Sequence, residues 1–201
     1  MHARTMGLFA SVVLLSGCVS LGGGDPPESL LTLTSEASSP AGHTSSGTRE
    51  ETLAVHEPEV PAAIDVLRVP VRVNDASIAY VENAVWVEKP ARLFRRVLAE
   101  TIRAETGMLV IDGDDPGLSA ASHLRGNLRE FGYDARNSSV TVRYDAIRVS
   151  STGMVETQRF ESVEQGISAN ASSVGAALNR ASNDVARQVV AWMAPDADGD
   201  S

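Results

Sequence analysis

The sequence predicts one domain of the α/β (α+β) class: a mixed sheet with an antiparallel meander, packed by two amphipathic helices. Residues 90–106 and 173–193 each place their apolar side chains on one side of a helical wheel. Residues 123–133, 140–149 and 154–163 have the pattern of strands separated by short turns, which favours antiparallel neighbours. A sheet that carries both helices on one face makes a two-layer domain, and 201 residues suffice for one domain with tails.

The amino terminus predicts an export signal that is removed from the mature chain. A basic start at Met1–Arg4 precedes an apolar run over residues 6–15 and the small residues Ser16 and Gly17. The run is much shorter than the ~20 apolar residues that a permanent transmembrane helix needs. We therefore expect residues 1–17 to be a signal peptide.

The end of this signal, Leu15-Ser16-Gly17-Cys18, resembles the bacterial lipobox. The small residues suit a narrow peptidase cleft, and a thiol is the side chain that forms a thioether to diacylglycerol. Cys18 is the only cysteine, so it has no partner for an internal disulfide. The resemblance implies that Cys18 carries the lipid, with palmitate among its acyl chains, and begins the mature protein. The alternative is an ordinary secretory signal followed by a stray cysteine.

The residue after the cysteine predicts which of the two membranes holds the protein. In the enterobacterial sorting rule an aspartate at this position retains a lipoprotein in the inner membrane, so Val19 favours the outer one. Residues 18–28 are expected to be the lipidated cysteine and a flexible tether. At ~3.3–3.6 Å per residue, residues 19–28 reach at most about 35 Å. The domain at residues 29–194 is therefore expected in the cell envelope, facing the periplasm.

Extended segments are expected before the first helix. Residues 29–34 have the pattern of a first strand, whereas residues 35–52 are rich in Ser, Gly, Thr and Glu and predict a disordered loop. Residues 64–73 are β-branched and bounded by turn signals. Pro70 within them cannot donate to a ladder and predicts a sheet edge or a bulge. Residues 78–81 are expected to continue the extended structure.

The helix at residues 90–106 begins at Pro90, which suits a first turn, and stops at Gly107. A strand at residues 108–111 and an acidic turn at residues 112–117 are expected to follow. The residues expected on the apolar side of this helix are Leu93, Phe94, Val97, Leu98, Thr101, Ile102 and Ala104.

The closing helix at residues 173–193 carries one narrow apolar stripe. Ser172 or Ser173 is expected to cap it, and Pro195 to stop it. Residues 195–201 are expected to form an acidic tail. The stripe consists of Val174, Leu178, Ala181, Val185, Val189 and Trp192.

Composition excludes several classes of function. A net charge of −9 disfavours nucleic acid, whose phosphates require a basic surface. There is no nucleophile elbow, phosphate-binding glycine loop or His/Cys cluster, so we expect no enzyme, cofactor or metal. The acidic clusters at residues 112–115 and 196–200 lack the carboxylate spacing of a calcium loop. An envelope hydrolase with an unrecognised site is the alternative that this scarcity disfavours.

A basic stripe on the first predicted helix is a candidate contact surface. Arg92, Arg95, Arg96 and Arg103 lie opposite the apolar side, where they could meet anionic headgroups or an acidic partner. The alternative is a solvated face on which Glu100 pairs with Arg96 or Arg103. Two tryptophans, at positions 86 and 192, are expected to pack in the core or at its rim.

The order of segments across the chain resembles the ABC-type transport auxiliary lipoprotein family. The likeness begins at the lipobox and continues through diffuse, mostly structural motifs. They are Leu30-Leu31-Thr32-Leu33, Val66-Leu67-Arg68-Val69-Pro70-Val71, Val85-Trp86-Val87-Glu88-Lys89-Pro90, Leu93-Phe94-Arg95-Arg96-Val97-Leu98, Leu124 to Phe131, and Val189-Val190-Ala191-Trp192-Met193.

The resemblance implies a fold like the small amino-terminal domain of the Tol-system propeller protein. It implies a non-catalytic docking or anchoring subunit that helps move phospholipid or other hydrophobic cargo between the inner and outer membranes. The implied partners are a mammalian-cell-entry (MCE) domain substrate-binding protein and an ABC permease/ATPase complex, with a ring of identical subunits as a further possibility. The alternative is an independent lipid- or lipopolysaccharide-binding lipoprotein, with a cavity between sheet and helices.

Overall fold

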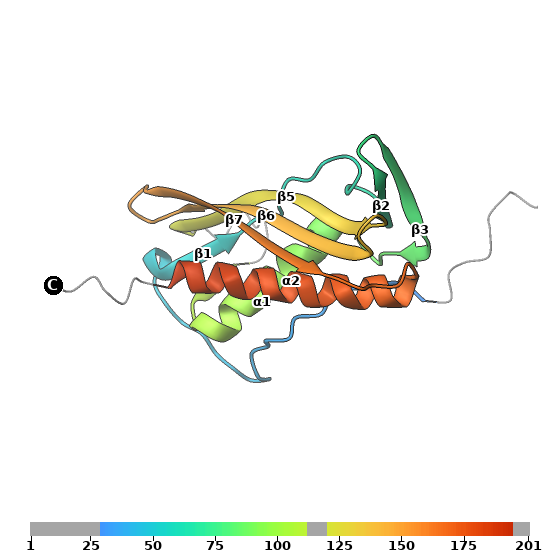
Figure 1. Cartoon of the computed structure of the whole chain (residues 1–201). Coiled ribbons are helices and arrows are strands. Elements are labelled where there is room, and N and C mark those ends of the chain that lie inside the picture. The colour runs from blue at the N-terminus through green and yellow to red at the C-terminus, as the bar shows by residue number, and fades with distance from the viewer. Residues whose placement is uncertain (1–28, 112–119, 195–201) are drawn as a thin grey trace, which may run out of the picture.

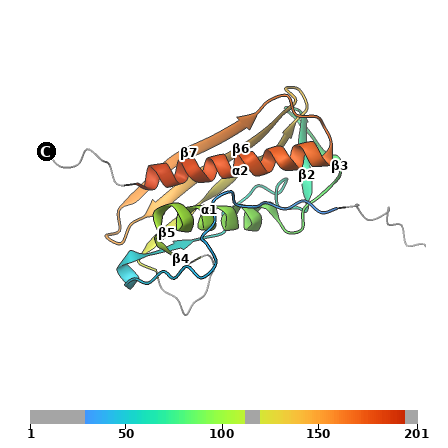
Figure 2. The same cartoon turned by 90° about the horizontal axis from the view of Figure 1, so that it is seen from below.

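A computed structural model describes residues 29–111 and 120–194. Within them one seven-stranded mixed sheet carries two helices on the same face (Figures 1 and 2), which confirms the predicted class. A short 3-10 helix at Arg49–Glu51 precedes the first strand. In chain order the elements are β1 (Thr52–Val55), β2 (Arg68–Asn74), β3 (Ser77–Val85), α1 (Pro90–Thr106), β4 (Leu109–Ile111), β5 (Ser122–Asp134), β6 (Ser139–Val149), β7 (Val155–Glu164) and α2 (Ala171–Met193).

The predicted antiparallel meander is confirmed and forms the long part of the sheet. β6 lies between β5 and β7, with His123 opposite Val149 at one end and Val140 opposite Glu164 at the other. Their alternating apolar residues face the helices, as the period of two requires. Gly126 of β5 lies so close to β6 that a Cβ atom would come within 2.2 Å of the Asp145 carbonyl oxygen, so only glycine fits there.

The other edge of β5 is shared by two short strands, and this sharing makes the sheet mixed. β1 runs parallel to the start of β5, and β2 runs parallel to its end, where Val71 is opposite Tyr133. β1 also pairs in parallel with β4, and β2 pairs antiparallel with β3. The crossover from β1 to β4 passes through α1, as a parallel pair needs.

Both helices are confirmed, with one correction at a cap. α1 has the predicted bounds and ends at Gly107, whose φ of 69° is the left-handed conformation that glycine adopts readily. α2 begins at Ala171, and its cap is Asn170 rather than Ser172 or Ser173. The reason is geometric: the Asn170 side-chain oxygen accepts from the backbone N–H of the third helical residue at 2.9 Å.

Aromatic residues fill the space between sheet and helices. Trp86, the largest fully buried side chain, packs against Phe131 with ring centroids 5.5 Å apart, so it belongs to the core as predicted. Phe94 of α1 meets Tyr144 of β6 edge to face. Burial raises the pKa of the Tyr144 phenol, and its hydroxyl donates to the backbone carbonyl of Arg125 at 2.8 Å.

The prediction of a strand over residues 29–34 is wrong. Only Leu31 makes a ladder contact, a single parallel bridge to Trp86. A few residues later the chain leaves the sheet, because α2 binds it: the Thr34 backbone N–H donates to Asn179 Oδ1 at 2.7 Å.

The loop predicted over residues 35–52 is confirmed for residues 35–48, which contain no helix or strand, and is wrong at its end. Arg49–Glu51 is helical, and Thr52 begins β1, which lies between β4 and β5. The earlier part of this segment has no regular structure, but helix side chains fix it. The Glu36 N–H, for example, donates to Asn183 Oδ1 at 2.8 Å.

The predicted strand at residues 64–73 begins only at Arg68, because Ile64 closes a turn by donating its backbone N–H to Pro61. The pairing with β3 shifts between Arg68 and Pro70, which confirms the irregularity expected at this proline. The extended structure expected at residues 78–81 is the middle of the longer β3.

Several predictions lie outside the described residues. They concern the signal peptide, the lipobox with Cys18, the tether, the acidic turn at residues 112–117 and the tail at residues 195–201.

Candidate functional site

Three of the four α1 arginines face carboxylates of the same chain. Arg96 donates to Glu88 at 2.8 Å, and Arg92 lies 3.5 Å from Glu57 and 3.9 Å from Glu88. Arg103 pairs with Glu100, one of the two pairs expected for a solvated face. This part of the helix surface is therefore largely neutralised.

Arg95 differs from the other three. Its side chain is half-buried, and its Nε and Nη1 atoms are buried with no hydrogen-bond partner among the described residues. Ala99, one turn further along α1, is fully buried, so this flank of the helix is covered by protein. Arg95 is consequently less available to a partner than its place on the helical wheel indicates.

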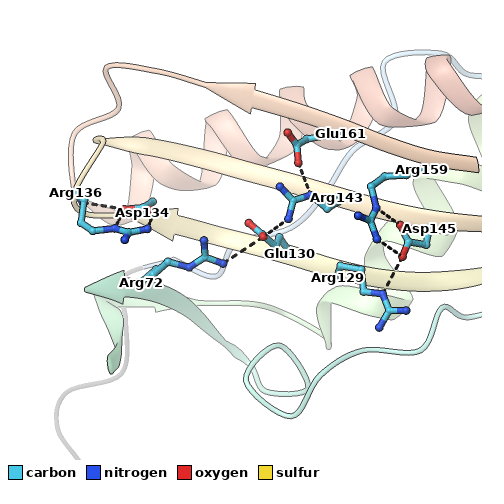
Figure 3. Close-up of polar contacts among 9 residues, drawn as sticks. All are labelled: Arg72, Arg129, Glu130, Asp134, Arg136, Arg143, Asp145, Arg159 and Glu161. Carbon is cyan, nitrogen blue, oxygen red and sulfur yellow. Dashed lines mark hydrogen bonds and ion pairs between the residues drawn. The ribbon is translucent and has the colours of Figure 1, made fainter. Parts of the chain in front are cut away.

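A lattice of ion pairs covers the face of the sheet turned away from the helices (Figure 3). Asp145 of β6 lies between two arginines. Arg129 of β5 donates to its Oδ2 at 2.9 Å, and Arg159 of β7 binds both of its oxygens, at 2.6 and 2.9 Å. The Asp145 carboxylate thus ties three adjacent strands together.

Glu130 makes a second junction in this lattice. It accepts from Arg143 of β6 and lies 3.3 Å from Arg72 of β2, while Arg143 also pairs with Glu161 of β7 (Figure 3). Charges of opposite sign therefore alternate across four strands, and the lattice offers little net charge to a ligand. We call these two junctions, together with Arg136 and Asp134 beside them, the charge lattice.

The lattice lowers the pKa of its aspartates. Hydrogen bonding to Arg159 first, and then to Arg129, holds the pKa of Asp145 at about 2. Arg136 does the same for Asp134, whose pKa is also about 2. Both carboxyl groups remain ionised near neutral pH, so they are suited to structure rather than to proton transfer.

We expect Asp145→Asn to destabilise the protein by about 1 kcal/mol at neutral pH, since its arginine partners are more than half exposed and water screens the pairs. The folded-state pKa lies below the ordinary 3.8, so the stabilisation is present above that value and lost as the pH falls through about 2. Denaturant titrations from pH 7 downwards measure the difference from the wild type. Asp75→Asn, at a 95% exposed side chain, is the matched control and should change little.

A pocket of about 230 Å³ opens beside the charge lattice. It lies under the segment at residues 61–64 and between β2, β3 and β5. Its lining is largely apolar, and Arg72, Arg129, Glu130 and Asp134 belong to both pocket and lattice. The predicted lipid cavity was placed between sheet and helices, where buried aromatic side chains pack instead.

The free edge of β7 is another accessible feature. β7 pairs only with β6 among the described strands, and Val155 and Val163 are exposed on it. Unpaired edge strands are templates for strand addition. This edge is the second candidate contact surface, beside the arginines of α1.

The described residues contain no group of three or more His, Cys, Asp or Glu side chains that could hold a metal ion. His56 Nε2 lies 3.0 Å from His123 Nδ1, which is an internal hydrogen bond. Among the described residues, neither α1 nor α2 is long and apolar enough to cross a membrane.

Sequence reasoning missed the charge lattice. A signal was available, because charged residues alternate along the predicted strands, as in Arg143-Tyr144-Asp145 of β6. The strand register that brings these charges together is set by pairing across strands, which the one-dimensional pattern does not contain.

Comparison with solved structures identifies proteins of similar fold. The fold is similar to a crystal structure from Xanthomonas campestris, with TM-score 0.65 and 17% identity over 82% of this chain and 93% of the other. A second crystal structure, of an uncharacterised protein, gives TM-score 0.63 and 12% identity over 72% and 93% of the two chains. The search of curated proteins gave no match.

The family model for the ABC-type transport auxiliary lipoprotein component matches residues 31–190. This range runs from the Leu31 bridge through the sheet to the last turn of α2, so it includes α1, most of α2 and all seven described strands. The resemblance found in the sequence is thereby confirmed: the chain belongs to the ABC-type transport auxiliary lipoprotein family.

Proposed function

We propose that this protein is the membrane-anchored docking subunit of an ABC-type transporter that moves phospholipid or other hydrophobic cargo between the inner and outer membranes. The observation that carries the proposal is the family match over residues 31–190. The lipobox at Leu15–Cys18 supports the anchor. The chain's own contribution is mechanical: it holds a partner within a few tens of ångströms of a membrane, and no catalytic step is assigned to it.

The proposed location is the periplasmic face of the outer membrane, with the lipid on Cys18. It predicts that Val19→Asp moves the protein from the outer to the inner membrane fraction, because aspartate after the lipidated cysteine is the retention signal of the enterobacterial rule. Density-gradient separation of membranes measures the shift. Val19→Ala should stay with the outer membrane, and an unchanged distribution of the aspartate variant would contradict this placement.

The proposed partners are an MCE-domain substrate-binding protein and its ABC permease/ATPase complex, with nucleic acid disfavoured by the acidic composition. Of the two candidate contact surfaces, the β7 edge is the better supported. Arg92, Arg96 and Arg103 already have carboxylate partners, and Arg95 is partly covered, so α1 offers few free charges. β7 has a partner strand on one side only among the described strands, although Gln188 of α2 donates to the Glu161 carbonyl at 3.1 Å. Its other edge suits a partner strand or the next copy in a ring.

Two sets of variants separate these surfaces. Val155→Lys with Val163→Lys places charges on the β7 edge, where they oppose strand addition, at positions exposed enough to spare the fold. Arg92→Ala with Arg96→Ala removes the outer charges of α1. We expect the β7 variant to lose co-purification of the partner complex and the α1 variant to retain most of it. Full retention by a combined variant would refute contact through either surface.

The pocket favours a second candidate, an independent lipid- or lipopolysaccharide-binding lipoprotein. Its lining includes Ile64, Pro70 and Ile78, which could receive an aliphatic group. Native mass spectrometry of the purified protein distinguishes the two. A bound lipid that is lost when Ala63→Trp fills the pocket would favour this second function, whereas a lipid-free chain that retains its partners supports the docking subunit.

A further inference from the structure

Three segments distant in the sequence meet at one corner of the domain. The Leu31 N–H donates to Val85 at 2.7 Å, and Leu31 accepts from the Val87 N–H at 2.9 Å. The Trp86 N–H donates to the carbonyl of Leu67, also at 2.7 Å. These backbone bonds fix the start of the described chain to the segments before β2 and after β3.

Each of the three segments has one exposed aliphatic residue next to these backbone bonds. Leu30 is 52% exposed, Leu67 45% and Val87 46%, and we call these three residues the apolar corner. Their neighbours Leu31 and Trp86 are turned into the core. The corner is therefore held rigidly, and the ordering of its side chains costs little when they meet a surface.

Leu31 also fixes the corner to the start of α2. A Cβ atom at Gly175 would lie 2.7 Å from Leu31 Cδ2, so the Leu31 side chain rests directly on the helix backbone. The described chain begins beside β3 and this end of α2, at the right of Figures 1 and 2. The turn between β6 and β7 lies at the opposite end of the molecule in both views.

The charge around the corner is close to balanced, in contrast to the chain's net charge of −9. The ionisable residues within two positions of the corner residues are Glu28, Asp65, Arg68, Glu88 and Lys89, which sum to −1. Lys89 pairs with Asp65 at 2.9 Å, and the Arg68 guanidinium lies over an aromatic ring. An anionic membrane surface therefore does not repel this corner as it would repel the acidic chain as a whole.

The position of Cys18 in the sequence indicates that a lipid bilayer is the surface nearest to the apolar corner. Ten residues separate Cys18 from Ser29, the first described residue, and the chain between them spans at most about 40 Å. The lipid on Cys18 therefore keeps this end of the domain close to the bilayer. Even a small apolar contact is then made often, because tethering raises its effective concentration.

We propose that the apolar corner docks onto the membrane leaflet that holds the Cys18 lipid, with Leu30, Leu67 and Val87 in the headgroup region. The proposal rests on the proposed lipid anchor. Docking through this corner orients the domain, because it turns the β6–β7 turn and its exposed Met154 and Val155 away from the membrane. The β6–β7 end then faces the periplasm, where a partner can reach it.

Two tryptophans provide the test. Trp86 lies beneath the corner, whereas Trp192 is 17 residues beyond Gly175 on α2, about 25 Å along the helix. The lipidated full chain is reconstituted into phosphatidylcholine vesicles with brominated acyl chains, which quench nearby indoles. Trp192→Phe leaves Trp86 as the only reporter, and Trp86→Phe leaves Trp192. Interfacial docking buries apolar groups only ~5–10 Å deep, so the brominated chains should come near Trp86, beneath the corner, and stay far from Trp192. We therefore expect bromolipid to quench the fluorescence of Trp86 about two-fold more than that of Trp192.

Matched surface variants separate docking from simple proximity. In the Trp192→Phe background, Leu30→Ser with Val87→Ser should remove most of the Trp86 quenching. Met154→Ser with Val155→Ser, at equally exposed aliphatic positions on the far turn, should leave it unchanged. An unshifted Trp86 emission maximum without bromolipid verifies that each variant is folded.

Equal quenching of the two tryptophans, or quenching that survives the corner variant, would overturn the proposal. The intact mass separates this failure from failure of the anchor. A chain with lipid on Cys18 that shows no preferential Trp86 quenching refutes the docking corner alone, whereas a chain without lipid refutes the anchor on which it rests.

Discussion

Replacing Cys18 with serine is expected to abolish lipid attachment. The thioether to diacylglycerol requires a thiol, and Cys18 is the only one in the chain. The variant should incorporate no labelled palmitate, and its intact mass should contain no lipid. If some Cys18→Ser chains remain in the membrane fraction, we expect them to retain the signal peptide with its apolar run at residues 6–15. Without lipid, the free energy that holds the domain at the bilayer is lost, since each buried CH₂ contributes ~0.8 kcal/mol.

The control for this experiment is Ser20→Ala, which changes a small residue outside the lipobox and should be lipidated normally. Gel mobility, palmitate labelling and intact mass are measured on both variants. A lipid mass that persists in Cys18→Ser would contradict the assignment of the attachment site. A wild-type chain without lipid, cleaved near residue 17, would instead favour the ordinary secretory signal.

Replacing Trp86 with alanine is expected to be the most destabilising single change, by about 3–5 kcal/mol. Trp86 is 1% exposed, packs on Phe131 and lies in the corner where three segments meet. Its Nε1 atom has no hydrogen-bond partner among the residues that the structure describes, so the expected loss comes from packing. A loss of this size is a large part of the stability of an ordinary domain. Urea unfolding of the mature domain, followed by circular dichroism, measures the change.

Trp192→Ala is the matched control. Trp192 is half-buried and contacts Phe160, so truncation should cost clearly less than at position 86. Similar losses at the two positions would show that the core is not organised around Trp86 as described here.

The parts of the fold that the sequence predicts are those with a complete local signal. The apolar period of α1 and its Pro90 and Gly107 ends lie within one segment, and its bounds are as predicted. The meander strands alternate regularly between short turns. β1 was missed because Thr52–Val55 has only four residues and is stabilised by pairing with β4 and β5, which lie far along the chain. Contacts of this kind leave no local pattern.

The same distinction applies to the candidate surfaces. Cys18 is predicted from four consecutive residues. The arginines of α1 are visible as a stripe, but two of their partners, Glu57 and Glu88, lie outside the helix and can be assigned only in three dimensions. The apolar corner is formed by three segments that the backbone bonds of Leu31 and Trp86 bring together. Neither the single bridge nor the exposure of these side chains follows from residue types alone.

Affinity purification of the lipidated protein from membranes, with mass spectrometry of the bound proteins and lipids, tests the central claim most directly. A docking subunit should recover an MCE-domain protein together with its permease and ATPase, and Val155→Lys with Val163→Lys should lower their yield. Recovery of lipid alone, with no transporter subunit in the wild type, would contradict the docking role and favour an independent lipid-binding lipoprotein.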